Sequence, residues 1–220
     1  MTNRDRTELL LVFVRSPRPG RVKTRLIARL GAHGAARLYR ELAEQVARQA
    51  GRLERPGLVQ RAVVDPPGAI EEVSAWLGPR FEAVAQRAGD LGERLSGAFE
   101  EAFDEGARRV VAIGTDCVDV TPVLLGEAFD ELMRADAVLG PALDGGYYLI
   151  GLARPFPSAF ERIPWSSERT LQVTRERLSD AGARIALLPA LRDVDDEADL
   201  DLLIEAHPEP FGRAQCKRRR

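Results

Sequence analysis

The first residues whose side chains could bind a ligand form a basic loop that follows a short apolar run. Residues 15–25 read RSPRPGRVKTR and hold five basic side chains. Gly20 allows a close backbone approach to a ligand, and Pro19 stiffens the loop. Lys23 and Arg25 supply charged donors for phosphate oxygens at the start of the next expected helix. The loop lacks Walker A spacing, so it predicts a different phosphate site, with a solvated basic turn as the alternative.

Two aspartates could hold a divalent cation. Asp116 directly follows the apolar run 110–113, and Asp193 follows a later one. Carboxylates at the ligand edge of a sheet are hard oxygen donors, and Mg²⁺ or Mn²⁺ on a diphosphate would neutralise charge on a leaving group. We therefore predict a metal site at Asp116 and Asp193 if their strand ends are adjacent. The neighbouring acids and Thr121 are assigned to helix capping and helix N-terminal charge.

The 144–146 segment, Asp-Gly-Gly, lies between two apolar runs. This pattern is a strong turn signal and predicts a hairpin. A turn needs no particular acid, however, and Gly145 and Gly146 would leave space for a ligand beside Asp144, with Tyr147 as a stacking face. Both interpretations stay open.

Two weaker signals lie in the segments 86–95 and 163–167. The first places Asp90 among glycines after a predicted strand, and the second places Trp165 before a helix that Ser167 could cap. Trp165 is interpreted as a core or lid aromatic that could cover an acceptor.

These residues are spaced along alternating strands and helices. Short apolar runs predict strands at 9–14, 58–64, 81–85, 110–113, 137–141, 147–152 and 184–188. Helical patterns lie at 24–30, 34–49, 69–77, 91–105, 122–133, 168–181 and 196–205. The alternation predicts an α/β fold with a mainly parallel sheet covered on both faces. We expect one domain over residues 1–206 and a frayed basic tail over 207–220.

Composition narrows the function classes. The 220 residues carry a formal net charge of -2, so no global field attracts nucleic acid or an anionic membrane. The basic tetrad at 217–220 is interpreted as part of a solvated terminus. The polar N-terminus resembles neither a signal peptide nor a membrane span, and Cys117 and Cys216 do not form a disulfide framework. We expect a cytoplasmic protein that binds neither nucleic acid nor membrane.

Taken together, the motifs resemble the DUF2064 family within the GT-A-like nucleotide-diphospho-sugar transferase superfamily. The resemblance spans residues 9–203 and is strongest in the segments 19–26, 89–95, 114–117, 140–148 and 193–195. The family pattern usually reads Gly-x-Asp-Cys-Pro in the central motif, where this chain has Val118 at the proline position.

The resemblance implies a three-layer GT-A-like (Rossmann-like) fold, a divalent metal and a nucleotide-linked donor. On the matching motifs, Pro19, Gly20, Lys23, Arg25 and Asp90 would bind nucleotide or phosphate. Asp116 and Asp193 would hold the metal and Asp144 would act on the acceptor, which would contact Gly145, Gly146, Tyr147 and Trp165. The expected reaction is sugar transfer to a small molecule. The alternatives are nucleotidyl transfer from an NTP, as in 2-phospholactate guanylyltransferase, and nucleotide binding without catalysis. Oligomeric state is not predicted.

Overall fold

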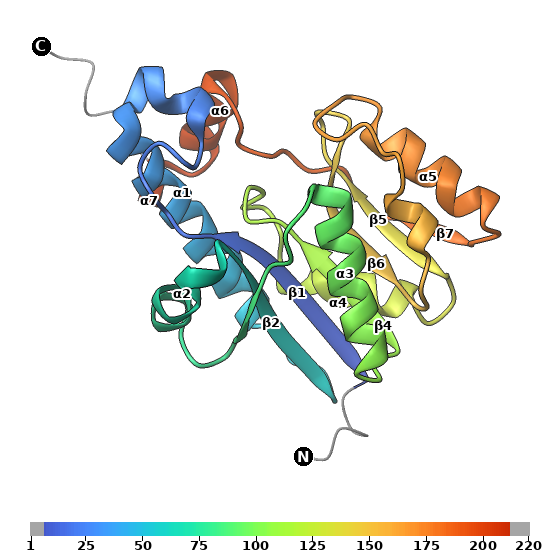
Figure 1. Ribbon diagram of the computed structural model, residues 1–220. Coiled ribbons are helices and arrows are strands. Elements are labelled where there is room, and N and C mark those ends of the chain that lie inside the picture. Colours follow the sequence, from blue (N-terminus) through green and yellow to red (C-terminus); the bar gives the residue numbers. More distant parts are fainter. Residues whose placement is uncertain (1–6, 212–220) are drawn as a thin grey trace, which may run out of the picture.

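A seven-stranded sheet is the centre of the computed structural model, which describes residues 7–211 (Figure 1). Its strands are β1 (Glu8–Arg15), β2 (Leu58–Asp65), β3 (Glu82–Ala85), β4 (Arg109–Ile113), β5 (Ala137–Pro141), β6 (Tyr147–Leu152) and β7 (Ile185–Leu187). Their order is β3-β2-β1-β4-β6-β5-β7, and β6 runs antiparallel to both of its neighbours while the remaining pairs are parallel. The predicted mainly parallel sheet is confirmed.

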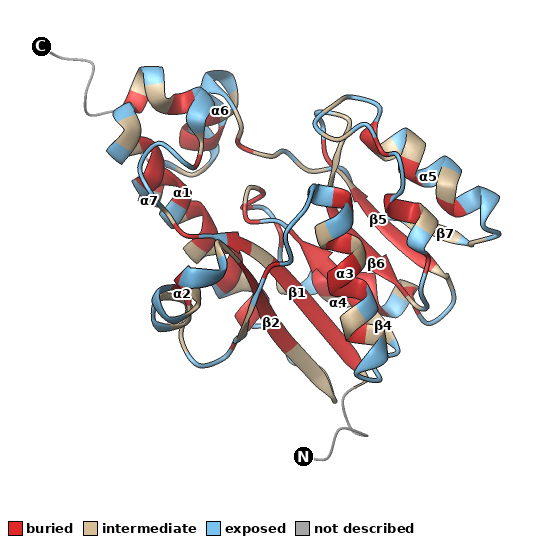
Figure 2. Cartoon of the chain, in the orientation of Figure 1, coloured by how far each residue is buried: buried red, intermediate tan, exposed pale blue. Residues whose placement is uncertain are grey.

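Helices cover both faces of this sheet, as predicted. The α-helices are α1 (Ile27–Gly51), α2 (Ile70–Leu77), α3 (Leu91–Asp104), α4 (Pro122–Glu131), α5 (Thr170–Asp180), α6 (Glu197–Ala206) and α7 (Pro208–Phe211). The short 3₁₀ turns are η2 (Thr24–Leu26), η3 (Pro67–Ala69) and η4 (Pro157–Phe160). One core cluster packs α1, α2 and α4 against the sheet, and a second packs α3, η4 and α5 against the other face. The inner strands β1, β4, β6 and β5 are largely buried, whereas the edge strands β3 and β7 are partly exposed (Figure 2). The three-layer GT-A-like fold is therefore confirmed.

Capping residues fix where several helices begin. Asp90 caps α3, where its side chain accepts a hydrogen bond from the Glu93 N–H and Glu93 reciprocates at the Asp90 N–H. Thr121 caps α4 ahead of Pro122, in agreement with its predicted role. These reciprocal bonds satisfy N–H groups that the first turn of a helix leaves unpaired.

The first helical region is interrupted near the position where the sequence predicts a break between two helices. α1 runs from Ile27 to Gly51 but has a non-helical residue, Gly31, with φ of 71° and ψ of 161°. A positive φ is accessible to glycine at little cost. The predicted break near this position is therefore a kink inside one helical region.

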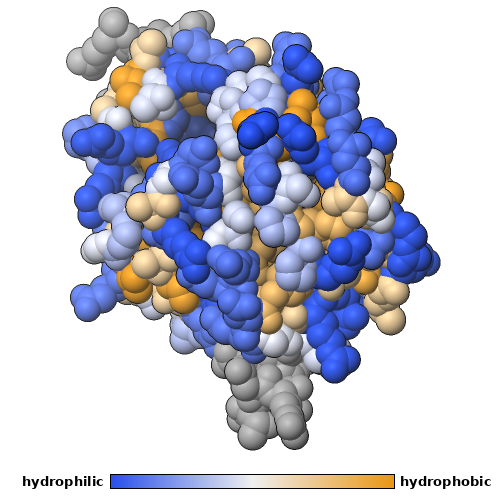
Figure 3. Space-filling view, turned by 45° about the vertical axis from the view of Figure 1, so that its right-hand side comes forward, coloured by the Kyte–Doolittle hydropathy of each residue, from blue (hydrophilic) through white to orange (hydrophobic). Residues whose placement is uncertain are grey.

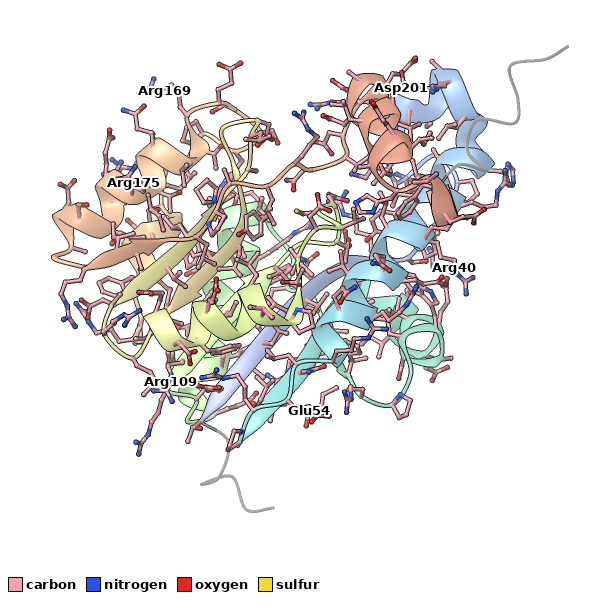
Figure 4. The ribbon with its side chains drawn as sticks, turned by 180° about the vertical axis from the view of Figure 1, so that it is seen from behind. Arg40, Glu54, Arg109, Arg169, Arg175 and Asp201 are labelled. Carbon is pink, nitrogen blue, oxygen red and sulfur yellow. The ribbon has the colours of Figure 1, made fainter. Side chains whose placement is uncertain are left out.

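A third cluster of apolar side chains lies beyond the sheet and joins the C-terminal end of the described chain to η2 and the first half of α1. Here α6 and α7 pack on the first turns of α1, and Phe211 at the end of α7 is 1% exposed. Seen from behind, α6, where Asp201 is labelled, lies beside α1, and Asp201 forms an ion pair with Arg29 (Figure 4). The packed structure thus extends to residue 211, five residues past the expected domain end at 206. The basic residues 217–220 lie outside the described residues.

The described surface is mainly polar. Hydrophilic side chains cover most of the face seen in Figure 3, with hydrophobic ones in small groups among them. Within residues 7–211, no helix combines the length and the apolar character needed to cross a bilayer.

Candidate functional site

A cavity of about 560 Å³ opens at the carboxyl ends of β1 and β4. Because β6 is antiparallel, its first residues, Tyr147 and Tyr148, reach the same edge of the sheet and line the cavity as well. Of the predicted site residues, five line it: Lys23, Arg25, Asp116, Tyr147 and Asp193. The others, Pro19, Gly20, Asp90, Asp144, Gly145, Gly146 and Trp165, are not among its lining residues.

Lys23 lines the cavity and forms ion pairs with Asp116 and Asp195. Its side chain is only 5% exposed, and its ammonium nitrogen lies 2.8 Å from Asp116 Oδ1 and 3.0 Å from Asp195 Oδ1. Burial alone would lower the pKa of Lys23, but the two carboxylates outweigh it and raise that pKa above its usual value. Lys23 is therefore a fixed positive charge between the loop after β4 and the segment before α6.

The backbone at Lys23 is unusual for a residue with a side chain. Its φ is 45° and its ψ is 48°, a left-handed conformation immediately before η2. Such a conformation is unfavourable for L-residues other than glycine, by roughly 1 kcal/mol or more. The strained turn directs Lys23 toward the acids, and strain of this kind clusters at functional sites of proteins.

The structure brings Asp116 and Asp193 together at the cavity, although the strands that precede them, β4 and β7, are separated in the sheet by β6 and β5. Both side chains line the cavity, and the Val194 N–H donates a hydrogen bond to the Asp116 carbonyl at 3.1 Å. Asp193 Oδ1 is buried and accepts no hydrogen bond from any described residue. Burial raises the pKa of Asp193 to about 7, with further contributions from the charges of Asp116, Asp144 and Asp195. The site therefore holds more negative charge than Lys23 neutralises.

These acids fit a hard divalent cation by their chemistry. Asp193 offers a buried oxygen without a donor, and Asp116 lies beside it. Among residues 7–211, no three His, Cys, Asp or Glu side chains are already arranged around a common metal position. A cation at this place would be held by Asp116 and Asp193 after side-chain adjustment, with phosphate or water oxygens completing its coordination.

The excess negative charge around Asp193 is expected to lower the stability of the folded protein. Asp193→Asn should raise the melting temperature of the metal-free protein at pH 8 by about 4 °C. The usual aspartate pKa is 3.8, whereas that of folded Asp193 is about 7, so its ionisation destabilises the native state increasingly from pH 4 to 7 and fully above. The gain should shrink toward pH 5.

Thermal unfolding in EDTA at both pH values measures this effect. Asp195→Asn is the matched control, because it removes a neighbouring carboxylate that is paired with Lys23 and should give no gain. An Asp193→Asn protein that melts at or below the wild-type temperature at pH 8 would contradict the electrostatic interpretation.

Tyr39 is a site residue that sequence reasoning missed. It lies on α1, and its buried hydroxyl accepts a hydrogen bond from the Arg15 N–H at 2.7 Å and lies 3.1 Å from Thr115 Oγ1. Burial and the charge of Asp116 raise the pKa of Tyr39 to about 12, so the phenol stays protonated. The hydroxyl thereby ties the end of β1 to the end of β4. In the sequence, Tyr39 is one more apolar position of an amphipathic helix, so no signal marked it.

Arginines form another wall of the cavity. Arg94 donates to Gln86 Oε1 at 3.1 Å and to the Gly89 carbonyl at 2.8 Å, which fixes its guanidinium. Asp65, the last residue of β2, lies 3.3 Å from Arg15 and 3.5 Å from Arg94. Arg15 and Arg94 therefore bring positive charge to the side of the cavity near β2 and β3.

The 144–146 segment forms the predicted turn between β5 and β6. Asp144 Oδ1 accepts a hydrogen bond from the Gly146 N–H at 2.8 Å. Gly145 has φ of +89°, and a Cβ there would lie 2.3 Å from the Glu168 carbonyl oxygen, so glycine is required. The turn also brings Asp144 close enough to raise the pKa of Asp193. The predicted hairpin turn is therefore confirmed, and the role of Asp144 toward a ligand stays a prediction.

Trp165 packs beside the cavity and does not line it. Its ring meets Tyr147 edge-on, with centroids 6.3 Å apart. Its indole nitrogen lies close to Gly92 on α3, where a Cβ would approach it to 3.0 Å. Trp165 therefore supports Tyr147 and the start of α3. Asp90 is occupied as the cap of that helix, and Pro19 and Gly20 are exposed ahead of η2.

Val118, at the family's proline position, is buried two residues after Asp116. It is 6% exposed and belongs to the third cluster, together with Val194 and Phe211. Cys117 next to it is a buried free thiol whose pKa is raised, chiefly by burial. The acidic loops are thus anchored by apolar neighbours in the same cluster.

The chain matches known proteins over its whole fold. A family profile described as "Uncharacterized protein conserved in bacteria (DUF2064)" matches residues 49–167. A candidate nucleotide-diphospho-sugar transferase from Desulfovibrio desulfuricans G20 is 37% identical, with TM-score 0.84 and coverage of 98% of this chain and 93% of that one. No protein with a curated function matches.

More distant structures share the fold. The inositol-1-phosphate CTP transferase of T. maritima has TM-score 0.58 at 14% identity, covering 96% of this chain and 98% of its own. Glucosyl-3-phosphoglycerate synthase from Mycobacterium tuberculosis, in complex with Mg²⁺ and UDP, has TM-score 0.53 at 12% identity, covering 86% and 70%. The profile match over more than half of the chain and the 37% identity to the Desulfovibrio protein establish the relationship: this chain belongs to the DUF2064 family.

Proposed function

We propose that the protein is a metal-dependent transferase that moves a sugar from a nucleotide-diphosphate sugar to a small-molecule acceptor. The observation that carries the proposal is the meeting of a basic loop and an acidic cluster in one cavity, through Lys23, Asp116 and Asp193. The 37% identical Desulfovibrio protein, a candidate transferase of this class, supports it.

The donor's phosphates would lie on the basic side of the cavity. Lys23 and Arg25 lie at η2, after the loop that follows β1, and Arg15 is the last residue of that strand. Their cationic N–H groups make strong hydrogen bonds to phosphate oxygens. Asp116 and Asp193 would hold Mg²⁺ or Mn²⁺, which supplies charge neutralisation for the departing nucleoside diphosphate.

The acceptor would approach from the β5–β6 turn. Asp144 is exposed at this turn and could orient or deprotonate an acceptor hydroxyl, while Tyr147 offers an aromatic face inside the cavity. Gly145 and Gly146 keep the turn free of side chains. Trp165 would act through Tyr147, on whose ring it packs.

The test is donor turnover. Purified protein with Mn²⁺ should release nucleoside diphosphate slowly from at least one member of a panel of UDP, GDP, ADP and dTDP sugars, measured by chromatography. The rate should depend on Mn²⁺ and fall in EDTA. Absence of binding and of hydrolysis across the whole panel would reject the proposal.

A second candidate function is nucleotidyl transfer from an NTP to a phosphorylated small molecule. Arg15 and Arg94 favour it, because they place positive charge beyond that needed for a diphosphate. The fold shared with the inositol-1-phosphate CTP transferase is compatible with it. Pyrophosphate release from CTP or GTP with a sugar phosphate would decide for this reaction and against sugar transfer. Either reaction is proposed to take place in the cytoplasm on small molecules.

A further inference from the structure

The Lys23 ammonium occupies the acidic side of the cavity. It lies 2.8 Å from Asp116 Oδ1, the buried oxygen of a proposed metal ligand, and 3.0 Å from Asp195 Oδ1. The Lys23 side chain is 5% exposed, so the acids enclose its ammonium group and little of it faces solvent. Lys23 is therefore a counter-ion of both acids in this structure.

A divalent cation would compete with this counter-ion. A cation on Asp116 and Asp193 would lie within a few ångströms of the ammonium, and like charges at such distances repel strongly inside a protein. Both would also draw on the negative charge of the Asp116 carboxylate, which Lys23 contacts at 2.8 Å. The lysine stem has four flexible bonds, so the ammonium can move without the loop.

We propose that Lys23 is a resident counter-ion that a divalent cation displaces from Asp116 and Asp195, and that the displaced ammonium then binds the donor's phosphates. The inference rests on the metal site of the proposed function. It makes cation and donor binding mutually favourable, because phosphates hold Lys23 away from the acids and the cation leaves Lys23 free for phosphates. By linkage, each ligand then strengthens the other by the same factor.

The exposed neighbour Arg25 provides a matched comparison. Its guanidinium lies 3.6 Å from Asp195 and its side chain is 67% exposed, so it adds a similar charge without contacting Asp116. Removing Arg25 tests the general effect of lost positive charge, whereas removing Lys23 tests displacement.

The first experiment measures binding of Mn²⁺ alone, by electron paramagnetic resonance of the free ion. Lys23→Met should bind Mn²⁺ on the order of tenfold more tightly than wild type. Lys23→Arg should bind no more tightly, because it keeps the charge, and Arg25→Met should differ from wild type by about threefold or less. The gain should vanish in Lys23→Met/Asp116→Asn. Thermal unfolding checks folding, and Mn²⁺ should raise the melting temperature of Lys23→Met more than that of wild type.

The second experiment observes the lysine itself. The chain contains two lysines, Lys23 and Lys217, so a protein labelled with ¹³Cε-lysine gives two side-chain signals that Lys23→Arg assigns. Saturation with diamagnetic Mg²⁺ should shift the Lys23 signal toward that of a solvent-exposed lysine and leave the Lys217 signal unchanged.

Equal Mn²⁺ affinity of Lys23→Met and wild type would overturn the inference, as would an unmoved Lys23 signal at saturating Mg²⁺. Failure of Lys23→Met to bind Mn²⁺ at all would overturn it as well. These readouts need no turnover. If no nucleotide sugar reacts but Lys23→Met still gains Mn²⁺ affinity, the proposed reaction fails and the displacement stands.

Discussion

Asp116→Asn should lower metal-dependent donor turnover by about 10²–10³-fold, because several kcal/mol of charge stabilisation depends on the bound cation. Asparagine keeps the shape of the side chain but removes its negative charge. It also leaves Lys23 with Asp195 as its remaining carboxylate partner in the site. Initial rates at saturating Mn²⁺, with Mn²⁺ affinity measured in parallel, separate loss of the cation from loss of fold.

Asp119→Asn is the control for this prediction. Asp119 lies three residues later in the same loop, but its carboxylate lies 2.9 Å from His207 Nε2 and does not line the cavity. Its removal should change the rate by about twofold or less, because an exposed pair of this kind contributes little. An Asp116→Asn protein that retains wild-type turnover would show that Asp116 holds no catalytic cation.

Phe211→Ala should destabilise the protein by about 3 kcal/mol, because it empties a fully buried aromatic position. Phe211 packs with Leu26, Leu203 and other members of the third cluster. For a chain of this length, such a loss corresponds to a melting temperature lower by about 8 °C. Thermal and denaturant unfolding would measure it.

Leu202→Ala is the matched control in α6. Leu202 is 44% exposed, and its truncation should change the free energy of unfolding by about 0.5 kcal/mol. Equal effects of the two substitutions would mean that α7 contributes no cooperative packing. A melting temperature for Phe211→Ala equal to that of wild type would contradict the role of the third cluster.

The sequence predicted the elements well, because apolar runs and turn residues are local signals. The boundaries of β5 and β6 agree to the residue with the predicted 137–141 and 147–152. The order of the strands is not local, and the reversal of β6 followed only from the hairpin interpretation. α7 was missed because its few residues carry no helical periodicity, and a tertiary contact of Phe211 holds them.

The site was predicted as a set of charged residues, but their pairings were not. Lys23 was expected to bind phosphates, and the structure pairs it with Asp116 and Asp195. This pairing depends on how three distant segments meet, which residue spacing does not encode. Asp90 was expected at the ligand because it follows a strand, yet the same position suits a helix cap, and the cap formed. Tyr39 carried no chemical signal at all.

The pairing of Lys23 with Asp195 joins positions 172 residues apart. A chain leaves the ribosome from its N-terminus, and domains fold as their residues become available. Lys23 and Asp116 are therefore synthesised well before the segment that contains Asp193 and Asp195. During synthesis the basic loop has no complete acidic partner, and a product released early would have most of the sheet but half of the site. The acidic side of the candidate site is therefore complete only after residue 195 has been synthesised.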